Sequence, residues 1–476
     1  MVILNESKKI KNLELYKRNA IILASLLGIT GMTQAAECYG VINRYTTASN
    51  GTACTVSGSN YDYIHAANPG TIITVTNPVS VVSSSSATAA VIASNGSSIN
   101  FMGDTTVSAI GQRHGVYIME GSNVIINGNL NSTPSGKNAR AIYIGGQGAS
   151  LIVNGDLTGT RIRNIGGAVV ELTGGNSITV GGATHLIGNS TDGLRNAGTA
   201  VFSEDVIIDA NNYIQGIINR NTGTIMANGN MNINATNMSE GGLINQSGVI
   251  TIKKDLTIVN DTTAAVNTSG ISISGGKVSV EGNTKVDVTG TTTNNMSNAY
   301  AAGIRVTGVN SIFESLGTNN TITTTGMNAH GLYITNGTIA LGTSGSAANG
   351  ITVLLESGNI KTSGEGAYGI YALPPTSGDV TIDVSSTASV ETTGNGSVGV
   401  IGGNDGAGNV SITTAGKVDA KFIGVYAYFN ETTSTGNIKV TETGGSIKGG
   451  MTGLYTYTYG SGDTTVISNA AVTGGN

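Results

Sequence analysis

The chain has 476 residues, including 71 glycines, five prolines and no tryptophan, and charged residues make up 11% of it, about half the usual share. Its formal net charge of −5, with no basic cluster in the body of the chain, argues against binding to nucleic acid or to anionic lipid. Such a composition would also suit a disordered chain, but the regular apolar alternation described below argues against disorder.

Residues 1–36 are typical of a secretory signal peptide. A basic region (8–18) precedes an apolar core (20–30), and small residues at 33–36 offer a cleavage site. The apolar core is too short to span a membrane. These 36 residues carry five of the 23 basic and two of the 28 acidic residues, so the mature chain would have a net charge of −8. We therefore expect export through the periplasm.

Residues 37–98 are interpreted as an N-terminal cap with the first repeats, and they contain both cysteines of the chain, Cys38 and Cys54. Secretion into an oxidising compartment and the short separation favour a disulfide that closes a loop at the end of the molecule. Two free thiols are the alternative, because an even count permits a bond but does not prove it.

Residues 99–476 form a repeat series. Eight segments, 22 to 28 residues apart, hold an apolar residue, any residue, a second apolar residue, a spacer that is usually glycine, and then Asp or Asn. The spacers are Gly103, Gly128, Gly155, Gly182, Glu204, Gly229, Lys254 and Gly282. The residues after them are Asp104, Asn129, Asp156, Ala183, Asp205, Asn230, Asp255 and Asn283, with Ala183 the one exception.

The apolar residues of the repeat alternate with a period of two, which indicates strands, and Gly with Asn or Asp marks tight turns between them. About 25 residues hold three short strands, and a unit of this length buries its apolar side only by stacking on its neighbours. The sequence therefore predicts an all-β fold, a right-handed parallel β-helix with three-strand coils of about 25 residues. The main alternative is a β-propeller, whose blades are longer.

We assign no catalytic, cofactor-binding or metal-binding residues from the sequence. Four recurrent aspartates could be interpreted as acids of a β-helix enzyme, but they alternate with Asn at one turn position. They are Asp104, Asp156, Asp205 and Asp255. Asn caps turns as Asp does, whereas only Asp does acid–base work. The four histidines lack metal-ligand spacing. We expect no cofactor.

Tyrosines follow an inward apolar residue in several coils, and they should point outward. In particular, Tyr455, Tyr457 and Tyr459 would share one outer face and form a possible binding face. The alternative is that neighbouring tyrosines only stack on one another along the rod.

The signal peptide, the Gly/Asn/Ser/Thr-rich body with almost no cysteine and the β-helical coils together resemble the passenger domain of a bacterial autotransporter, of the pertactin-like and diffuse-adherence-adhesin kind. The resemblance covers residues 37–476 and is one of composition and architecture. It implies passage through the outer membrane, display at the cell surface or release, and a role in virulence. Such proteins end in a translocating β-barrel, whereas this chain ends at Asn476 inside the repeats, so an outer-membrane translocator is expected in cis or in trans.

Two functional hypotheses follow. The first is a surface-exposed or secreted rod that acts in adhesion or self-association, with a surface glycan, a protein or another copy of the rod as partner and with no nucleic acid. The second is a β-helix enzyme that cleaves polysaccharides, of the pectate-lyase or glycosidase type.

Overall fold

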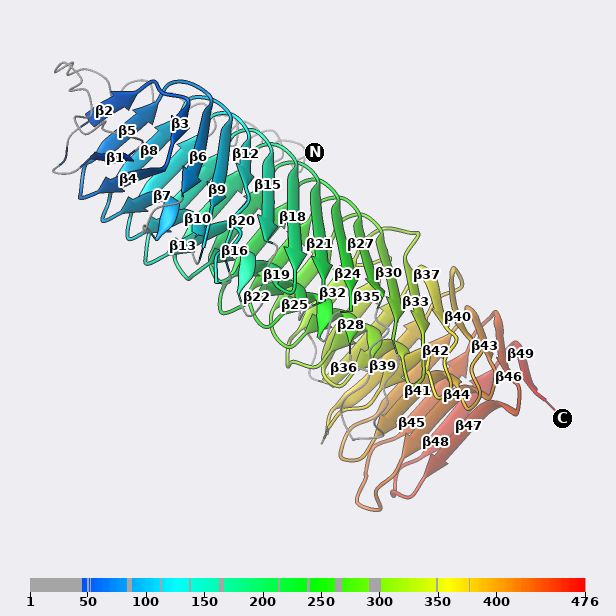
Figure 1. The fold of residues 1–476 in the computed structure, drawn as a ribbon. Helices are drawn as coiled ribbons and strands as arrows, with labels where there is room; N and C mark the ends of the chain where they lie inside the picture. Colours follow the sequence, from blue (N-terminus) through cyan, green and yellow to red (C-terminus); the bar gives the residue numbers. More distant parts are fainter. Residues whose placement is uncertain are drawn as a thin grey trace, which may run out of the picture.

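The protein is described here by a computed structural model that covers residues 45–48, 51, 53–83, 88–111, 114–136, 138–161, 167–212, 215–237, 240–261, 268–290, 301–347, 350–375 and 377–475. In these residues every regular element is a β-strand. The strands form three parallel sheets, here called A, B and C, which stack into one elongated rod (Figure 1). The predicted parallel β-helix with three strands per coil is thus confirmed.

Each coil contributes one strand to each sheet in the order A, B, C. Sheet A contains β1 (Tyr45–Ala48), β4 (Tyr63–Ala67), β7 (Ala89–Ser94), β10 (His114–Met119), β13 (Ile142–Gly145), β16 (Ala168–Leu172), β19 (Asp192–Asn196), β22 (Gln215–Asn219), β25 (Gly241–Asn245), β28 (Ser269–Ile273), β31 (Ala302–Val306), β34 (His330–Ile334), β38 (Ile370–Ala372), β41 (Val398–Asn404), β44 (Ile423–Phe429) and β47 (Thr452–Thr458). Sheet B contains β2 (Ala53–Val56), β5 (Ile72–Val75), β8 (Ser98–Phe101), β11 (Asn123–Ile126), β14 (Ser150–Val153), β17 (Ser177–Val180), β20 (Thr199–Phe202), β23 (Thr224–Ala227), β26 (Val249–Ile252), β29 (Lys277–Val280), β32 (Ile312–Ser315), β35 (Gly337–Leu341), β36 (Gly350–Leu355), β39 (Asp379–Val384), β42 (Val410–Thr414), β45 (Ile438–Glu442) and β48 (Thr464–Ser468). Sheet C contains β3 (Asn60–Tyr61), β6 (Val79–Ser83), β9 (Thr105–Ala109), β12 (Leu130–Ser132), β15 (Leu157–Arg161), β18 (Thr184–Asn189), β21 (Val206–Asn211), β24 (Met231–Thr236), β27 (Leu256–Asp261), β30 (Thr284–Thr289), β33 (Thr321–Thr325), β37 (Gly358–Thr362), β40 (Ala388–Thr392), β43 (Lys417–Ala420), β46 (Ser446–Gly449) and β49 (Ala471–Gly474).

The core is a set of apolar columns that run along the rod. Ile126 of β11 pairs with Phe101 of the coil before it and with Val153 of the coil after it, and all three side chains are 0% exposed. Because the strands are parallel and in register, each inward position meets the same position of its neighbours. All sixteen apolar residues that precede the eight spacers are buried in this way, so the predicted strand register is confirmed.

The corner where sheet A begins explains why a small residue precedes the inward apolar residue there. A Cβ on Gly193 would lie 2.3 Å from the Ile208 side chain, and one on Gly216 would lie 2.5 Å from the carbonyl oxygen of Gly242. Contacts this short force the backbone or a side chain to move. The corner therefore favours the smallest residues, which accounts for the pattern Gly-apolar in most of these strands, although β16 has Val169 at the position of Gly193.

The coil that starts at β35 departs from the three-strand plan. From β35 the chain returns directly to the same sheet and pairs with itself as β36, with Ile339 opposite Val353, so this turn of the rod has no strand in sheets C and A. The expected boundary between the N-terminal cap and the repeat series, after residue 98, falls inside a strand, because residue 98 is the first residue of β8. The N-terminal strands from β1 onward thus belong to the same rod as the later repeats.

Candidate functional site

The repeated Asp and Asn residues lie at the turn between sheets B and C, where each side chain binds the next coil. The Asp104 carboxylate accepts a hydrogen bond from the backbone N–H of Asn129 (2.8 Å). The Asn129 side-chain oxygen in turn accepts one from the N–H of Asp156 (2.7 Å). The Asp156 carboxylate accepts one from the N–H of Ala183 (2.9 Å). We call this chain of bonds the turn ladder. Its bonds support the turn interpretation of these carboxylates.

The turn ladder also explains why glycine precedes the Asp or Asn. A Cβ on Gly155 would lie 2.4 Å from the Asn129 side-chain oxygen, and one on Gly182 would lie 2.2 Å from that of Asp156. The oxygen that binds one coil thus occupies the space that a side chain on that coil would need. Glu204 is tolerated because the coil before it has Ala183 at the ladder position, which has no side-chain oxygen.

A second ladder, which the sequence analysis missed, runs along the turn between sheets A and B near the C-terminal end. The side-chain oxygens of Asp379, Asn409 and Asn437 accept hydrogen bonds from the backbone N–H groups of Asn409 (2.7 Å), Asn437 (3.0 Å) and Asp463 (2.9 Å). Asn409 is the last residue of the Gly-rich segment 402–409. Its side-chain oxygen accepts a hydrogen bond from the backbone of the neighbouring coil.

The tyrosines lie on the outer face of sheet A, as expected from the alternation. Tyr426 pairs with Tyr455, and Tyr428 pairs with Tyr457, on the neighbouring strands β44 and β47. We call these four residues and Tyr459 the tyrosine strip. The ring centroids are 5.5 Å apart for Tyr426 and Tyr455 and 5.8 Å apart for Tyr428 and Tyr457. The rings therefore point outward and also stack along the rod, while a binding role for this face stays a prediction.

Exposure differs among the members of the tyrosine strip and is highest at Tyr455 and Tyr459. Tyr428 is 8% exposed and belongs to a small apolar cluster on the outer face, whereas Tyr455 is 47% and Tyr459 is 64% exposed. Burial raises the pKa of the Tyr428 phenol above its usual value. The Tyr457 hydroxyl donates a hydrogen bond to the Asn430 side-chain oxygen. The sequence-predicted residues Tyr455, Tyr457 and Tyr459 thus form one aromatic surface, with two strongly exposed members.

Two histidines of sheet A bind the backbone of the next coil. The Nδ1 atom of His114 accepts a hydrogen bond from the backbone N–H of Arg140 (3.0 Å), and that of His330 accepts one from Tyr368 (3.0 Å). Burial lowers the pKa of His114 to about 4 and also lowers that of His330. The His114 ring stacks on Tyr117, with centroids 5.4 Å apart. Both imidazoles act as neutral acceptors.

A buried group of charged residues lies where sheets C and A meet in the first half of the rod. Arg161 is 1% exposed and donates a hydrogen bond to the Thr191 hydroxyl (2.7 Å), and burial lowers its pKa to about 10. The Asp192 carboxylate is 0% exposed and pairs with Arg195 (2.6 Å); burial raises its pKa. This group could not be predicted from the sequence, because only stacking of the coils brings its members together.

Some sequence predictions concern residues that lie wholly or partly outside the described part of the chain. Residues 1–36 and Cys38 lie outside the described residues. Cys54 lies on β2, is 4% exposed and is disulfide-bonded, while its pairing with Cys38 stays a prediction. In the described part of the chain, no helix is long and apolar enough to cross a membrane.

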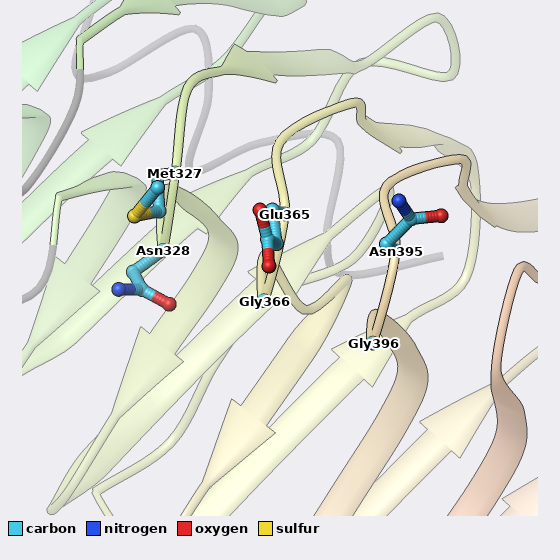
Figure 2. A pocket seen from close by; sticks show the side chains of 6 residues that line it. All are labelled: Met327, Asn328, Glu365, Gly366, Asn395 and Gly396. Carbon is cyan, nitrogen blue, oxygen red and sulfur yellow. The ribbon is translucent and has the colours of Figure 1, made fainter.

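A shallow polar pocket lies at three successive turns between sheets C and A. Its volume is about 340 Å³. It is lined by Met327, Asn328, Glu365, Gly366, Asn395 and Gly396 (Figure 2). Among the described residues, no group of three or more His, Cys, Asp or Glu side chains is placed to hold a metal ion. These turns could not be predicted as a site from the sequence, because one Asn or Glu per coil at a turn gives no distinctive pattern.

Comparisons of the chain with protein-family models, with curated proteins and with solved structures found no match.

Proposed function

We propose that this protein is an exported rod that acts in adhesion or self-association, and that the tyrosine strip makes the contact. The observation that carries the proposal is the in-register pairing of Tyr426 with Tyr455 and of Tyr428 with Tyr457 on one outer face. Stacking holds the rings in place before any partner arrives, so little side-chain freedom is lost on binding. Tyrosine is also among the residues that contribute most to interfaces.

The surroundings of the tyrosine strip favour a contact surface. Tyr455 and Tyr459 expose large amphipathic rings, which can pack against apolar surface while their hydroxyls stay hydrated or bind polar groups. A long repetitive rod also offers many similar contacts, whose combined avidity exceeds the affinity of any one of them. Export and display at the cell surface belong to the same proposal, supported by the signal-like pattern of residues 1–36.

The polysaccharide-cleaving alternative would need a basic residue beside acids that can reach a substrate. The group with Arg161, Asp192 and Arg195 has the right residue types, but the Asp192 carboxylate is 0% exposed and pairs with Arg195 at 2.6 Å. Asp192 is thus engaged within the protein, and removing either partner would leave a charge at the junction of sheets C and A without its counterpart, which is costly. We therefore favour the binding rod.

The test compares the purified protein with a variant in which Tyr455, Tyr457 and Tyr459 are changed to serine. The assays are glycan-array binding, bacterial clumping, and depolymerisation of pectin, alginate and chondroitin. We expect the wild type to bind or clump without cleaving polymer, and the serine variant to lose at least tenfold in binding. Circular dichroism should show that the variant keeps its β-structure.

The matched control changes Ile207, Met226 and Val249 to serine. These side chains are 37%, 36% and 42% exposed and lie on sheets B and C, so their loss removes exposed apolar area without touching the tyrosine strip. The control should bind as the wild type does. Polymer cleavage by the wild type would support the enzyme instead, and an equal loss of binding in both variants would remove the tyrosine strip from the mechanism.

A further inference from the structure

The polar pocket of Figure 2 is built from three successive coils of the rod. Each coil supplies two neighbouring residues, Met327 with Asn328, Glu365 with Gly366, and Asn395 with Gly396. The backbone N–H of Asn328 donates to the Glu365 carbonyl (2.9 Å), and that of Gly366 donates to the Asn395 carbonyl (2.9 Å). Because coils stack about 4.8 Å apart, the pocket spans about 10 Å along the rod on a fixed backbone.

The conformation of these turns keeps the pocket open. Gly366 and Gly396 have φ angles of 63° and 67°, in the left-handed region that glycine adopts without strain. A Cβ on Gly366 would lie 2.4 Å from the Asn328 side-chain oxygen, whereas a Cβ on Gly396 would meet nothing within 4 Å. The first glycine makes room for the asparagine side chain, and the second leaves open space beside Asn395.

The side chains of the pocket are free to bind a ligand. Within the described residues, the side chains of Asn328, Glu365 and Asn395 have no hydrogen-bond or ion-pair partner. Two amides provide donors and acceptors, and the carboxylate provides acceptors. Met327, 45% exposed, adds one apolar edge.

The chemistry of this lining narrows the class of ligand. No Lys, Arg or His lines the pocket, so nothing in it compensates the charge of a phosphate or a uronate, and Glu365 repels both. One methionine offers too little apolar surface for a lipid or an apolar peptide. The described residues offer no group of ligands for a metal ion. Mixed donors and acceptors without a positive charge suit neutral sugar hydroxyls.

We propose that this pocket binds a neutral oligosaccharide, with one or two of its sugar rings held by Asn328, Glu365 and Asn395. The volume of about 340 Å³ lies at the lower end of the range for small-molecule sites, so the pocket accommodates a short stretch of a longer chain. The site occupies the coils directly before the tyrosine strip, because Asn395 precedes β41 and β41 pairs with β44. It shares no residue with the strip. It adds a ligand class that the tyrosine strip does not define.

The test is isothermal titration of the full chain with cellotetraose, maltotetraose and mannotetraose, and with tetragalacturonic acid as the acidic contrast. We expect at least one neutral tetrasaccharide to bind with a Kd in the millimolar range or tighter. Tetragalacturonic acid should bind at least tenfold more weakly. The variant with Glu365→Gln and Asn395→Ala should raise the Kd of the neutral ligand at least tenfold.

Two controls separate this site from other effects. Glu356→Gln with Asn319→Ala changes an exposed acid and an exposed amide on other turns and should leave the Kd unchanged. The triple tyrosine variant should also keep this binding, so a failure of the proposed function and a failure of this site are distinguishable. Absence of binding to all three neutral ligands, equal binding of the acidic one, or an unchanged Kd in the pocket variant would overturn the proposal.

Discussion

The exception in the turn ladder gives a sharp prediction about coupling between coils. In most coils, Asp or Asn at the ladder position is followed by glycine in the next coil, because the side-chain oxygen lies 2.2 to 2.4 Å from a Cβ on Gly128, Gly155 or Gly182. Lys254, which follows Asn230, is the exception. The change Ala183→Asp would place a carboxylate oxygen equally close to the existing Cβ of Glu204. We expect this single variant to lose about 1–3 kcal/mol, as in other overpacked sites.

The change Glu204→Gly alone should cost about 0.5–1 kcal/mol, because glycine loses more backbone freedom on folding. Together, the two changes rebuild the geometry of the other coils, in which the carboxylate accepts the next backbone N–H at 2.7 to 2.9 Å. The new bond, to the N–H of Asp205, should contribute about 1 kcal/mol. With the clash relieved as well, the double variant should be about 2–4 kcal/mol more stable than the two single effects predict.

The assay is hydrogen exchange of residues 199–211, read by mass spectrometry, together with the urea midpoint of the whole chain. Local exchange is preferred because a stack of repeats need not unfold as one unit. Lys254→Gly is a second check, because the bond from the Asp255 N–H to Asn230 is 3.3 Å long, and removing the Lys254 side chain should shorten it and slow exchange there. Additive effects of the two changes at 183 and 204 would refute the steric account of the repeat.

Three further predictions follow from the buried positions. Val153→Asp puts a carboxylate into a fully buried column and should lower the free energy of unfolding by roughly 3 kcal/mol or more, whereas Asn154→Asp at the exposed neighbouring position should change it by less than about 0.5 kcal/mol; equal urea midpoints would mean a wrong register. His114 has its pKa lowered to about 4 in the folded protein, so the unfolded chain binds more protons between pH 6.5 and 4, and stability present above pH 6.5 should fall by roughly 3 kcal/mol as the pH drops to 4. Denaturation at pH 7 and pH 4.5 measures this loss, and His114→Gln should reduce it; a loss of the same size in that variant would assign it to other groups. Peptide mapping without reductant should find Cys38 linked to Cys54, a loop of about 15 residues worth roughly 3 kcal/mol, and two alkylatable thiols in the native protein would contradict the bond.

Inward residues could be predicted from the sequence because two regularities reinforce each other. Alternation along a strand fixes which side chains share a face, and the recurrence of Gly128-Asn129 and Gly155-Asp156 at the same point of each coil fixes which strands stack. Together they placed Ile126 and Val153 in one buried column. The spacing of the turn ladder thus predicts which residues of sheet B pair between neighbouring coils.

Contacts at the turns and at the junctions between sheets could not be predicted in the same way, because they depend on the length of each coil. Arg161 reaches Thr191, which is 30 residues away, while the ladder step from Asn283 to Asn319 spans 36 residues. No single period aligns both pairs. The direct return from β35 to β36 was also not visible, because the alternation in both strands is what any coil would show. The pocket at Glu365 and Asn395 depends on three such alignments at once.

Parallel, in-register stacking also determines how the rod should respond to a mechanical load. Each coil is held by its immediate neighbours, with ladder bonds that link residues about 27 positions apart. A force applied to the two ends of the chain would therefore detach the outermost coil first and leave the remaining stack intact. Each detachment would release about 27 residues, or roughly 90 Å of extended chain. The extension record should be a regular saw-tooth, with longer steps where the chain between Asn283 and Asn319 and that between Thr321 and Asn359 come free.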